Sequence, residues 1–147
     1  MKKVLAIALL ASGLIGLNSC ADAQKTSGSQ NEKSQVSQEV VTNNNDLNAA
    51  EFKDAIEAEG ITLLDVRTPQ EFAQGHLENA TIIDWYDPNF KAEADKLDKN
   101  TPVYLYCRSG SRSTSAKAAL IALGFKEVHQ MSGGINSWMG SGYPTVK

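Results

Sequence analysis

The chain has 147 residues, which is enough for one domain with a buried core and too few for two. Its 14 Lys and Arg residues are outnumbered by 17 Asp and Glu residues, and no long basic run follows the first three residues, so nucleic acid is not expected as a partner. Because the formal net charge is -3, an anionic small molecule would have to be attracted by a local cluster of arginines.

The N-terminus is typical of a targeting segment. Two lysines precede an apolar run over 4–17, which has the length of a signal-peptide core and is short for a membrane-spanning helix. The run ends in Leu-Asn-Ser-Cys, which resembles the lipobox of bacterial lipoproteins, although Asn18 stands where a smaller residue is usual. We therefore expect a signal peptide over 1–20 and lipidation of Cys20.

An alternative is ordinary signal-peptidase cleavage after the Ala-Asp-Ala site that ends at Ala23. Either route exports the protein, as a membrane-anchored lipoprotein facing the periplasm or the cell exterior, or as a soluble periplasmic protein. The polar composition of 21–45 predicts a disordered tether, and we expect the folded domain over 46–147.

Export changes the meaning of the two cysteines. Because Cys20 is either acylated or removed, Cys107 has no intramolecular disulfide partner in a compartment that favours disulfides. A free cysteine of this kind is either a small, inert core residue or a thiol kept for its reactivity. The loop that follows Cys107 favours the second interpretation.

From residue 46 onward, helical and strand patterns alternate. Asn48-Ala-Ala-Glu51 and Thr68-Pro-Gln-Glu71 have the form of capping boxes, each at the start of a short helix, and these helices end near Gly60 and Gly75. Strands are expected over 61–66, 80–84, 103–106 and 127–131, and further helices over 90–97, 113–123 and 135–139. This order predicts an α/β domain with a mostly parallel sheet, whose active edge lies at the carboxyl ends of the strands.

A loop rich in Arg, Ser and Gly joins the strand over 103–106 to the next helix, and Cys107 is its first residue. The loop amides and the helix N-terminus can face one point, which favours a thiolate. A thiol with a pKa of about 8.5 is about 3% ionised at pH 7, whereas lowering the pKa by about two units makes it mostly thiolate. Gly110 lets the backbone curl, and Arg108 and Arg112 add positive charge unless they are ordinary surface arginines.

Three blocks in a fixed order resemble the single-domain rhodaneses, a sulfurtransferase family, over about 47–143. The first block is Asp65-Val-Arg67 with Glu71-Phe and Gly-His76-Leu-Glu-Asn-Ala, the second is Cys107-Arg-Ser-Gly-Ser-Arg112-Ser, and the third is Gly-Phe, Val128, Met-Ser-Gly-Gly-Ile and Trp138. The resemblance implies a rhodanese-like three-layer α/β domain with a mostly parallel central sheet flanked by helices.

The resemblance also implies residue roles. Cys107 would be the nucleophile, and the substrate would be bound by the remaining loop residues Arg108, Ser109, Gly110, Ser111 and Arg112. Arg67 matches a position often assigned to substrate binding, and an equal alternative is that Asp65 and Arg67 form a polar network under the loop. Glu71 and His76 are interpreted as structural supports that bridge the loop and the helix.

The implied reaction is a two-step sulfur transfer. Cys107 would take the sulfane sulfur of a small anionic donor such as thiosulfate or a persulfide, and cyanide or a thiol would then remove it. No metal or organic cofactor is required, although a protein thiol or persulfide could be a partner. The alternative from another class is a persulfide carrier or protein-interaction module of the same fold without turnover.

The length of the loop bears on the choice between sulfur and phosphate chemistry. Related phosphatases and arsenate reductases place five residues between the cysteine and an arginine, which makes a cradle for a tetrahedral oxyanion. Here only four residues separate Cys107 from Arg112, and the next position is Ser113. The shorter loop favours sulfur transfer over phosphatase activity.

Overall fold

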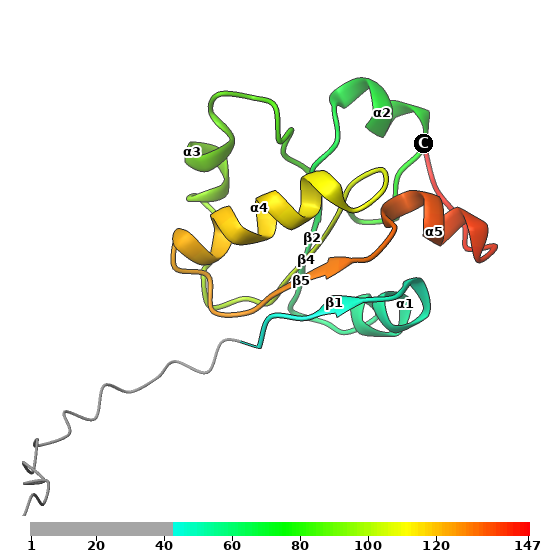
Figure 1. Cartoon of the computed structure of the whole chain (residues 1–147), viewed down its shortest axis with the longest axis horizontal. Coiled ribbons are helices and arrows are strands. Elements are labelled where there is room, and N and C mark those ends of the chain that lie inside the picture. The colour runs from blue at the N-terminus through cyan, green and yellow to red at the C-terminus, as the bar shows by residue number, and fades with distance from the viewer. Residues whose placement is uncertain (1–42) are drawn as a thin grey trace, which may run out of the picture. The chain divides into compact units, whose positions relative to one another are not determined.

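The structure, a computed structural model, describes residues 43–147 (Figure 1). The predicted signal peptide, the lipidation site Cys20 and the tether up to residue 42 lie outside the described residues. Between residues 43 and 147, no helix is long and apolar enough to span a membrane. The whole segment expected to form the folded domain, 46–147, is among the described residues.

Five parallel strands form the central sheet, in the order β1-β5-β4-β2-β3. The strands are β1 (Asp46–Leu47), β2 (Thr62–Asp65), β3 (Thr81–Ile82), β4 (Val103–Tyr106) and β5 (Val128–Met131). Parallel neighbours need crossover connections, and the alternating helices supply them. The carboxyl ends of β2, β4 and β5 consequently lie along one edge of the sheet, as predicted.

Within the described residues, five helices accompany the sheet, and two of them begin at a capping box. The helices are α1 (Ala49–Ile56), α2 (Pro69–Gln74), α3 (Phe90–Ala94), α4 (Ser111–Ala122) and α5 (Gly134–Gly140). Asn48 and Thr68 each close a capping box with a glutamate, which confirms both predicted helix starts. The prediction for α3 was three residues too long, and α4 begins two residues earlier than predicted, because Gly110 adopts φ +102° and serves as its N-cap.

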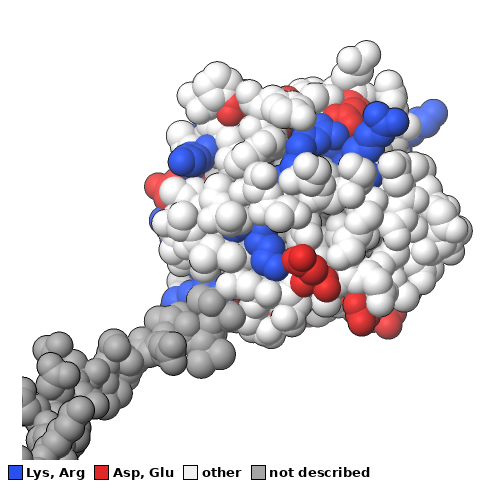
Figure 2. All heavy atoms as spheres, in the orientation of Figure 1, with Lys and Arg blue, Asp and Glu red and all other residues white. Residues whose placement is uncertain are grey.

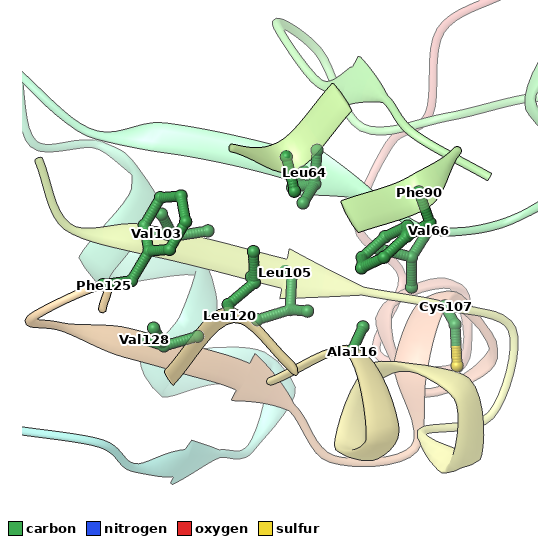
Figure 3. Packing of buried hydrophobic residues seen from close by; sticks show 11 residues of the cluster. Leu64, Val66, Phe90, Val103, Leu105, Cys107, Ala116, Leu120, Phe125 and Val128 are labelled. Atoms are coloured by element: carbon green, nitrogen blue, oxygen red, sulfur yellow. The ribbon is translucent and has the colours of Figure 1, made fainter. Parts of the chain in front are cut away.

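Each face of the sheet carries its own apolar cluster, because side chains alternate along the strands. Leu64, Leu105 and Val128 pack with residues of α3 and α4 on one face (Figure 3). Leu63 and Tyr106 pack with residues of α1 and α5 on the other face. The domain therefore has three layers, as expected, and the cluster on the α4 side also includes Cys107.

Two sets of hydrogen bonds near the ends of the domain could not be predicted from the sequence pattern. Asn45 accepts a hydrogen bond from Gln130 N–H, and Asn44 Oδ1 accepts one from Val128 N–H, so contacts with β5 begin two residues before the expected domain start at 46. Near the other end, His76 and Val146 exchange backbone hydrogen bonds of 2.9 and 2.8 Å. This bridge fastens the C-terminal segment beside α2.

Candidate active site

Cys107 lies where β4 ends and is 1% exposed. Gly110 N–H donates a hydrogen bond to its Sγ at 3.1 Å, and Ser113 Oγ lies 3.6 Å from the same sulfur. In Figure 3 the sulfur is directed toward the first turn of α4. Within the part of the chain that the structure describes, Cys107 forms no disulfide.

The pKa of the Cys107 thiol is set by two opposing effects. Burial raises it, whereas hydrogen bonds from the Ser113 hydroxyl and from the backbone amides of Ser113, Ser109 and Gly110 lower it. The hydrogen bonds prevail, so the pKa lies below the ordinary value for a cysteine. The left-handed conformation of Gly110 turns the loop amides inward, which is the role that the sequence predicted for this glycine.

The N-terminus of α5 holds the back of the loop. Ile135 N–H donates to Cys107 O at 2.8 Å, and Asn136 N–H donates to Arg108 O at 3.1 Å. Gly134 comes so close that a Cβ on it would lie 2.4 Å from Cys107 O. The sequence suggested only that Gly133 and Gly134 end a strand, since nothing in the pattern of residues shows which backbone they approach.

Asp65 and Arg67 form the polar network expected beneath the loop. The Asp65 carboxylate is fully buried and accepts hydrogen bonds of 3.0 Å from Arg67 Nε and 2.6 Å from Arg67 Nη2. Arg67 Nη2 also donates to Gly75 O at 2.7 Å, so most of the guanidinium is held by the protein. The Arg67 pKa is raised, because the interaction with Asp65 outweighs its desolvation.

Arg112 faces a carboxylate. Its Nη1 and Nη2 each donate to a different oxygen of Glu71 at 2.7 Å, and its guanidinium carbon lies 5.4 Å from the centre of the Tyr86 ring. Glu71 thus links α2 to the loop over 107–112, here called the active loop, which is the bridging position expected for it. The sequence contained no signal that this ion pair would engage an arginine assigned to substrate binding.

The remaining loop residues are exposed. Arg108 makes no ion pair or side-chain hydrogen bond with residues 43–147, whereas Ser109 and Ser111 lie on the surface on either side of Gly110. His76 lies farther off, where its ring stacks on Phe72 with 3.7 Å between ring centres and its Nδ1 contacts Phe72 O at 3.1 Å. His76 therefore supports α2 rather than contacting the loop.

An open hollow of about 410 Å³ lies beside the loop, between α2, α5 and the C-terminal segment. Its wall includes the two arginines Arg67 and Arg108, the apolar side chains of Ile135 and Met139, and Thr145. Figure 2 shows Lys and Arg side chains gathered beside an acidic group at one end of the molecule. Across 43–147, no three or more His, Cys, Asp or Glu residues gather as metal ligands would.

Sequence reasoning overlooked two polar residues at the site. Ser113, expected only as the last residue of the loop motif and the start of a helix, contacts Sγ, and Gln130 of β5 accepts a hydrogen bond from Ser113 Oγ at 2.8 Å. Gln130 is 5% exposed. A glutamine in an otherwise buried strand was the available signal, because a buried amide must find partners.

Cys107 lies at the end of a parallel strand, in a loop whose amides converge on its sulfur. These features define a class of α/β proteins in which a loop stabilises a thiolate. The model of the rhodanese-like domain matches residues 48–141. The chain belongs to the rhodanese-like domain family.

Relatives and solved structures agree with this family. Thiosulfate sulfurtransferase GlpE of Pseudomonas entomophila is 40% identical over 91 residues, which cover 61% of this chain and 80% of the relative. A sulfurtransferase of Allochromatium vinosum is 36% identical over 90 residues, which cover 61% and 82%. The crystal structure of a rhodanese-related protein from Thermoplasma volcanium matches with a TM-score of 0.62 and 32% identity, covering 69% of this chain and 97% of that one.

Proposed function

We propose that the protein is a sulfurtransferase that moves sulfane sulfur from thiosulfate or a persulfide to a thiophilic acceptor through a persulfide on Cys107. The observation that carries the proposal is the convergence of the loop amides and Ser113 on Cys107 Sγ. Such a site stabilises a thiolate, because its hydrogen-bond donors are directed at the sulfur that carries the negative charge. The names of the two sulfurtransferase relatives support the same activity.

In the first step, the Cys107 thiolate attacks the outer sulfur of thiosulfate. A new S–S bond forms to Cys107, the S–S bond of thiosulfate breaks, and its electron pair leaves with sulfite. In the second step, cyanide or a thiolate attacks the outer sulfur of the persulfide and restores the Cys107 thiolate. Neither step needs a proton acceptor once the thiol is ionised, so no side chain has to act as a general base.

The donor would be attracted by the exposed Arg108, whose guanidinium makes no ion pair or hydrogen bond within residues 43–147. Arg67 reaches the wall of the same hollow, although its other contacts hold it in place. Arg112 is already neutralised by Glu71, so its contribution would be to position the loop. Of the three arginines predicted to bind substrate, Arg108 is thus the one whose side chain we expect to turn toward the donor.

The test measures sulfur transfer from thiosulfate, or from a thiol persulfide, to cyanide. Cys107→Ser is expected to lose more than about 1000-fold in rate, because the hydroxyl of serine cannot form the persulfide. Lys96→Met is the control, since the exposed ammonium group of Lys96 pairs with Glu93 of α3. Equal rates for wild type and Cys107→Ser with both donors would contradict the proposal.

Burial of Cys107 favours a second candidate, a persulfide carrier without efficient turnover. A buried persulfide would be protected from small thiols and would be released only to a protein partner that fits the site. Intact-mass measurement after donor treatment, combined with turnover rates, separates the candidates. A carrier gains one sulfur atom and keeps it when cyanide or a small thiol is added, whereas an enzyme loses it at the rate of turnover.

We also propose that the domain acts outside the cytoplasm and is tethered to a membrane through Cys20. The support lies in the sequence alone, in the apolar run over 4–17 and the polar stretch that follows it. Such a tether would place the active loop at a membrane surface facing the periplasm or the exterior. Its partners there would be small sulfur anions and exported thiols.

A further inference from the structure

The hydroxyl of Ser113 lies at a junction of three acceptors. Its Oγ is 3.6 Å from Cys107 Sγ, 2.8 Å from Gly110 O and 2.8 Å from Gln130 Oε1. A hydroxyl carries one proton and can donate it to one of these acceptors at a time. The stabilisation of a Cys107 thiolate therefore depends on which acceptor holds that proton.

The neighbouring contacts identify the strongest competitor. Gly110 O already accepts Thr114 N–H at 2.9 Å and Thr114 Oγ1 at 3.0 Å, so its lone pairs are occupied. Gln130 Oε1 has only a longer contact of 3.3 Å with Thr114 besides the one with Ser113. The proton of Ser113 is consequently drawn toward Gln130.

The amide of Gln130 is held in one orientation. Gln130 lies opposite Asp46 in the pairing of β5 with β1. The pKa of the Asp46 carboxyl is lowered, first by the hydrogen bond from Lys117 at 2.7 Å and further by the nearby side chain of Gln130. Gln130 Oε1 faces Ser113 Oγ, and a carboxylate on the other side favours this orientation, because only the NH₂ group of an amide can donate to it.

We propose that Gln130 is a positioning residue that draws the Ser113 hydroxyl proton away from Cys107 Sγ. For ionisation, the Ser113 hydroxyl must turn from Gln130 to the sulfur, so Gln130 limits how strongly the thiolate is stabilised. A less stabilised thiolate is a better nucleophile, because nucleophilicity falls as the thiol becomes more acidic. The proposal rests on the proposed function only in taking Cys107 as the nucleophile.

Charged groups surround the loop from several elements, and the test must keep them constant. Those on or near the elements that pack around Cys107 are Arg108, Arg112, Glu71, Asp65, Arg67, Asp46 and Lys117. Replacement of Gln130 by methionine changes none of these charges. Methionine also has a similar volume and no hydrogen-bond acceptor of comparable strength.

The experiment measures the thiol pKa of the purified full chain from the rate of alkylation of Cys107 by iodoacetamide as a function of pH, with Cys20→Ala in every variant. Gln130→Met is expected to lower the midpoint by about one pH unit, which is a tenfold rise in thiolate well below the pKa. Ser113→Ala is expected to raise the midpoint. Adding Gln130→Met to Ser113→Ala should change nothing further, because the contested proton is gone.

Ser115→Ala is the matched control, since it removes an exposed hydroxyl from the same helix that makes no hydrogen bond to Sγ, Gly110 O or Gln130 among residues 43–147. It is expected to move the midpoint much less than either main variant. An unchanged or raised midpoint in Gln130→Met would overturn the proposal, as would an equal shift in the Ser113→Ala background.

A second variant covers the case in which Gln130→Met does not fold. Asp46→Asn removes the carboxylate that orients the amide, at a half-exposed side chain. The midpoint should fall in the wild-type background and stay unchanged with Ser113→Ala, whereas a purely electrostatic effect would be equal in both and would refute the idea. Since alkylation needs no turnover, a missing sulfurtransferase activity would contradict the proposed function and leave this inference standing.

Discussion

Glu71 performs two tasks with one carboxylate. It accepts the Thr68 backbone N–H in the capping box of α2 and also binds the guanidinium of Arg112, 41 residues farther along the chain. Its pKa is lowered to about 2, first by the hydrogen bond from Arg112 and against the opposing effect of burial. A single side chain thus ties the start of a helix to the active loop.

The low pKa of Glu71 predicts a particular acid dependence of stability. Because the folded pKa of about 2 lies below the ordinary value of 4.5, the Glu71 contribution is present above pH 4.5 and is lost as the pH falls toward 2. Glu71→Gln is expected to lower the free energy of unfolding by about 1 kcal/mol at pH 7, and the difference should vanish near pH 2.

Urea unfolding at several pH values checks this expectation. Glu59→Gln, at an exposed position without an ion pair among residues 43–147, should behave as wild type does. A difference between Glu71→Gln and wild type that stays constant from pH 6 to pH 2 would argue against the assignment.

At this scale the sequence allowed Cys107 to be predicted as the nucleophile but did not show its environment. The prediction rests on a strand, a cysteine and a glycine-containing loop that follow one another directly. The pairing of Arg112 with Glu71 and the contact of Ser113 with Gln130 join residues 41 and 17 positions apart, and their chemistry suits many partners. Only the fold selects among those partners.

At the scale of secondary structure, the N-terminus of α5 packs directly against the loop that begins at Cys107. The first residue of α5, Gly134, has φ +58° and stands against Cys107 O and Arg108 O. Gly134→Ala is therefore expected to destabilise the domain by about 3 kcal/mol or more, since the new Cβ would overlap backbone atoms that cannot move without distorting the loop.

Gly140→Ala is the matched control, because Gly140 lies in the same helix and an added Cβ there meets nothing within 4 Å. Its effect should stay within about 0.5 kcal/mol of zero. Urea unfolding measures both variants, and a Gly134→Ala protein as stable as Gly140→Ala would show that the close approach does not constrain the loop.

Helices and strands with strong local sequence signals were predicted, whereas an element without such a signal was not. The helices α1 and α2 were predicted with their caps, because Asn48 and Thr68 form local hydrogen bonds with glutamates three residues away. The strand β1 was not predicted, since its two residues carry no periodicity and are extended only because β5 offers an edge to pair with.

For the whole molecule, the proposed tether predicts a change in location. In cell fractionation the wild-type protein should sediment with membranes, and Cys20→Ala should be released or mislocalised, because a lipid anchor requires that thiol. Cys107→Ser is the control and should remain with the membranes. An unchanged distribution of Cys20→Ala would refute the lipoprotein hypothesis.

The C-terminal segment has a practical consequence. Its Val146 is bridged to His76, Pro144 O accepts a 2.7 Å hydrogen bond from Trp138 Nε1, and Thr145 lines the hollow beside the loop. Figure 1 shows the C-terminal end of the chain beside α2. A photo-crosslinking group placed at Lys147, two residues beyond Thr145, is therefore expected to lie near the hollow. Light-induced crosslinking from that position would capture molecules that bind at the site, including those that dissociate too fast to co-purify.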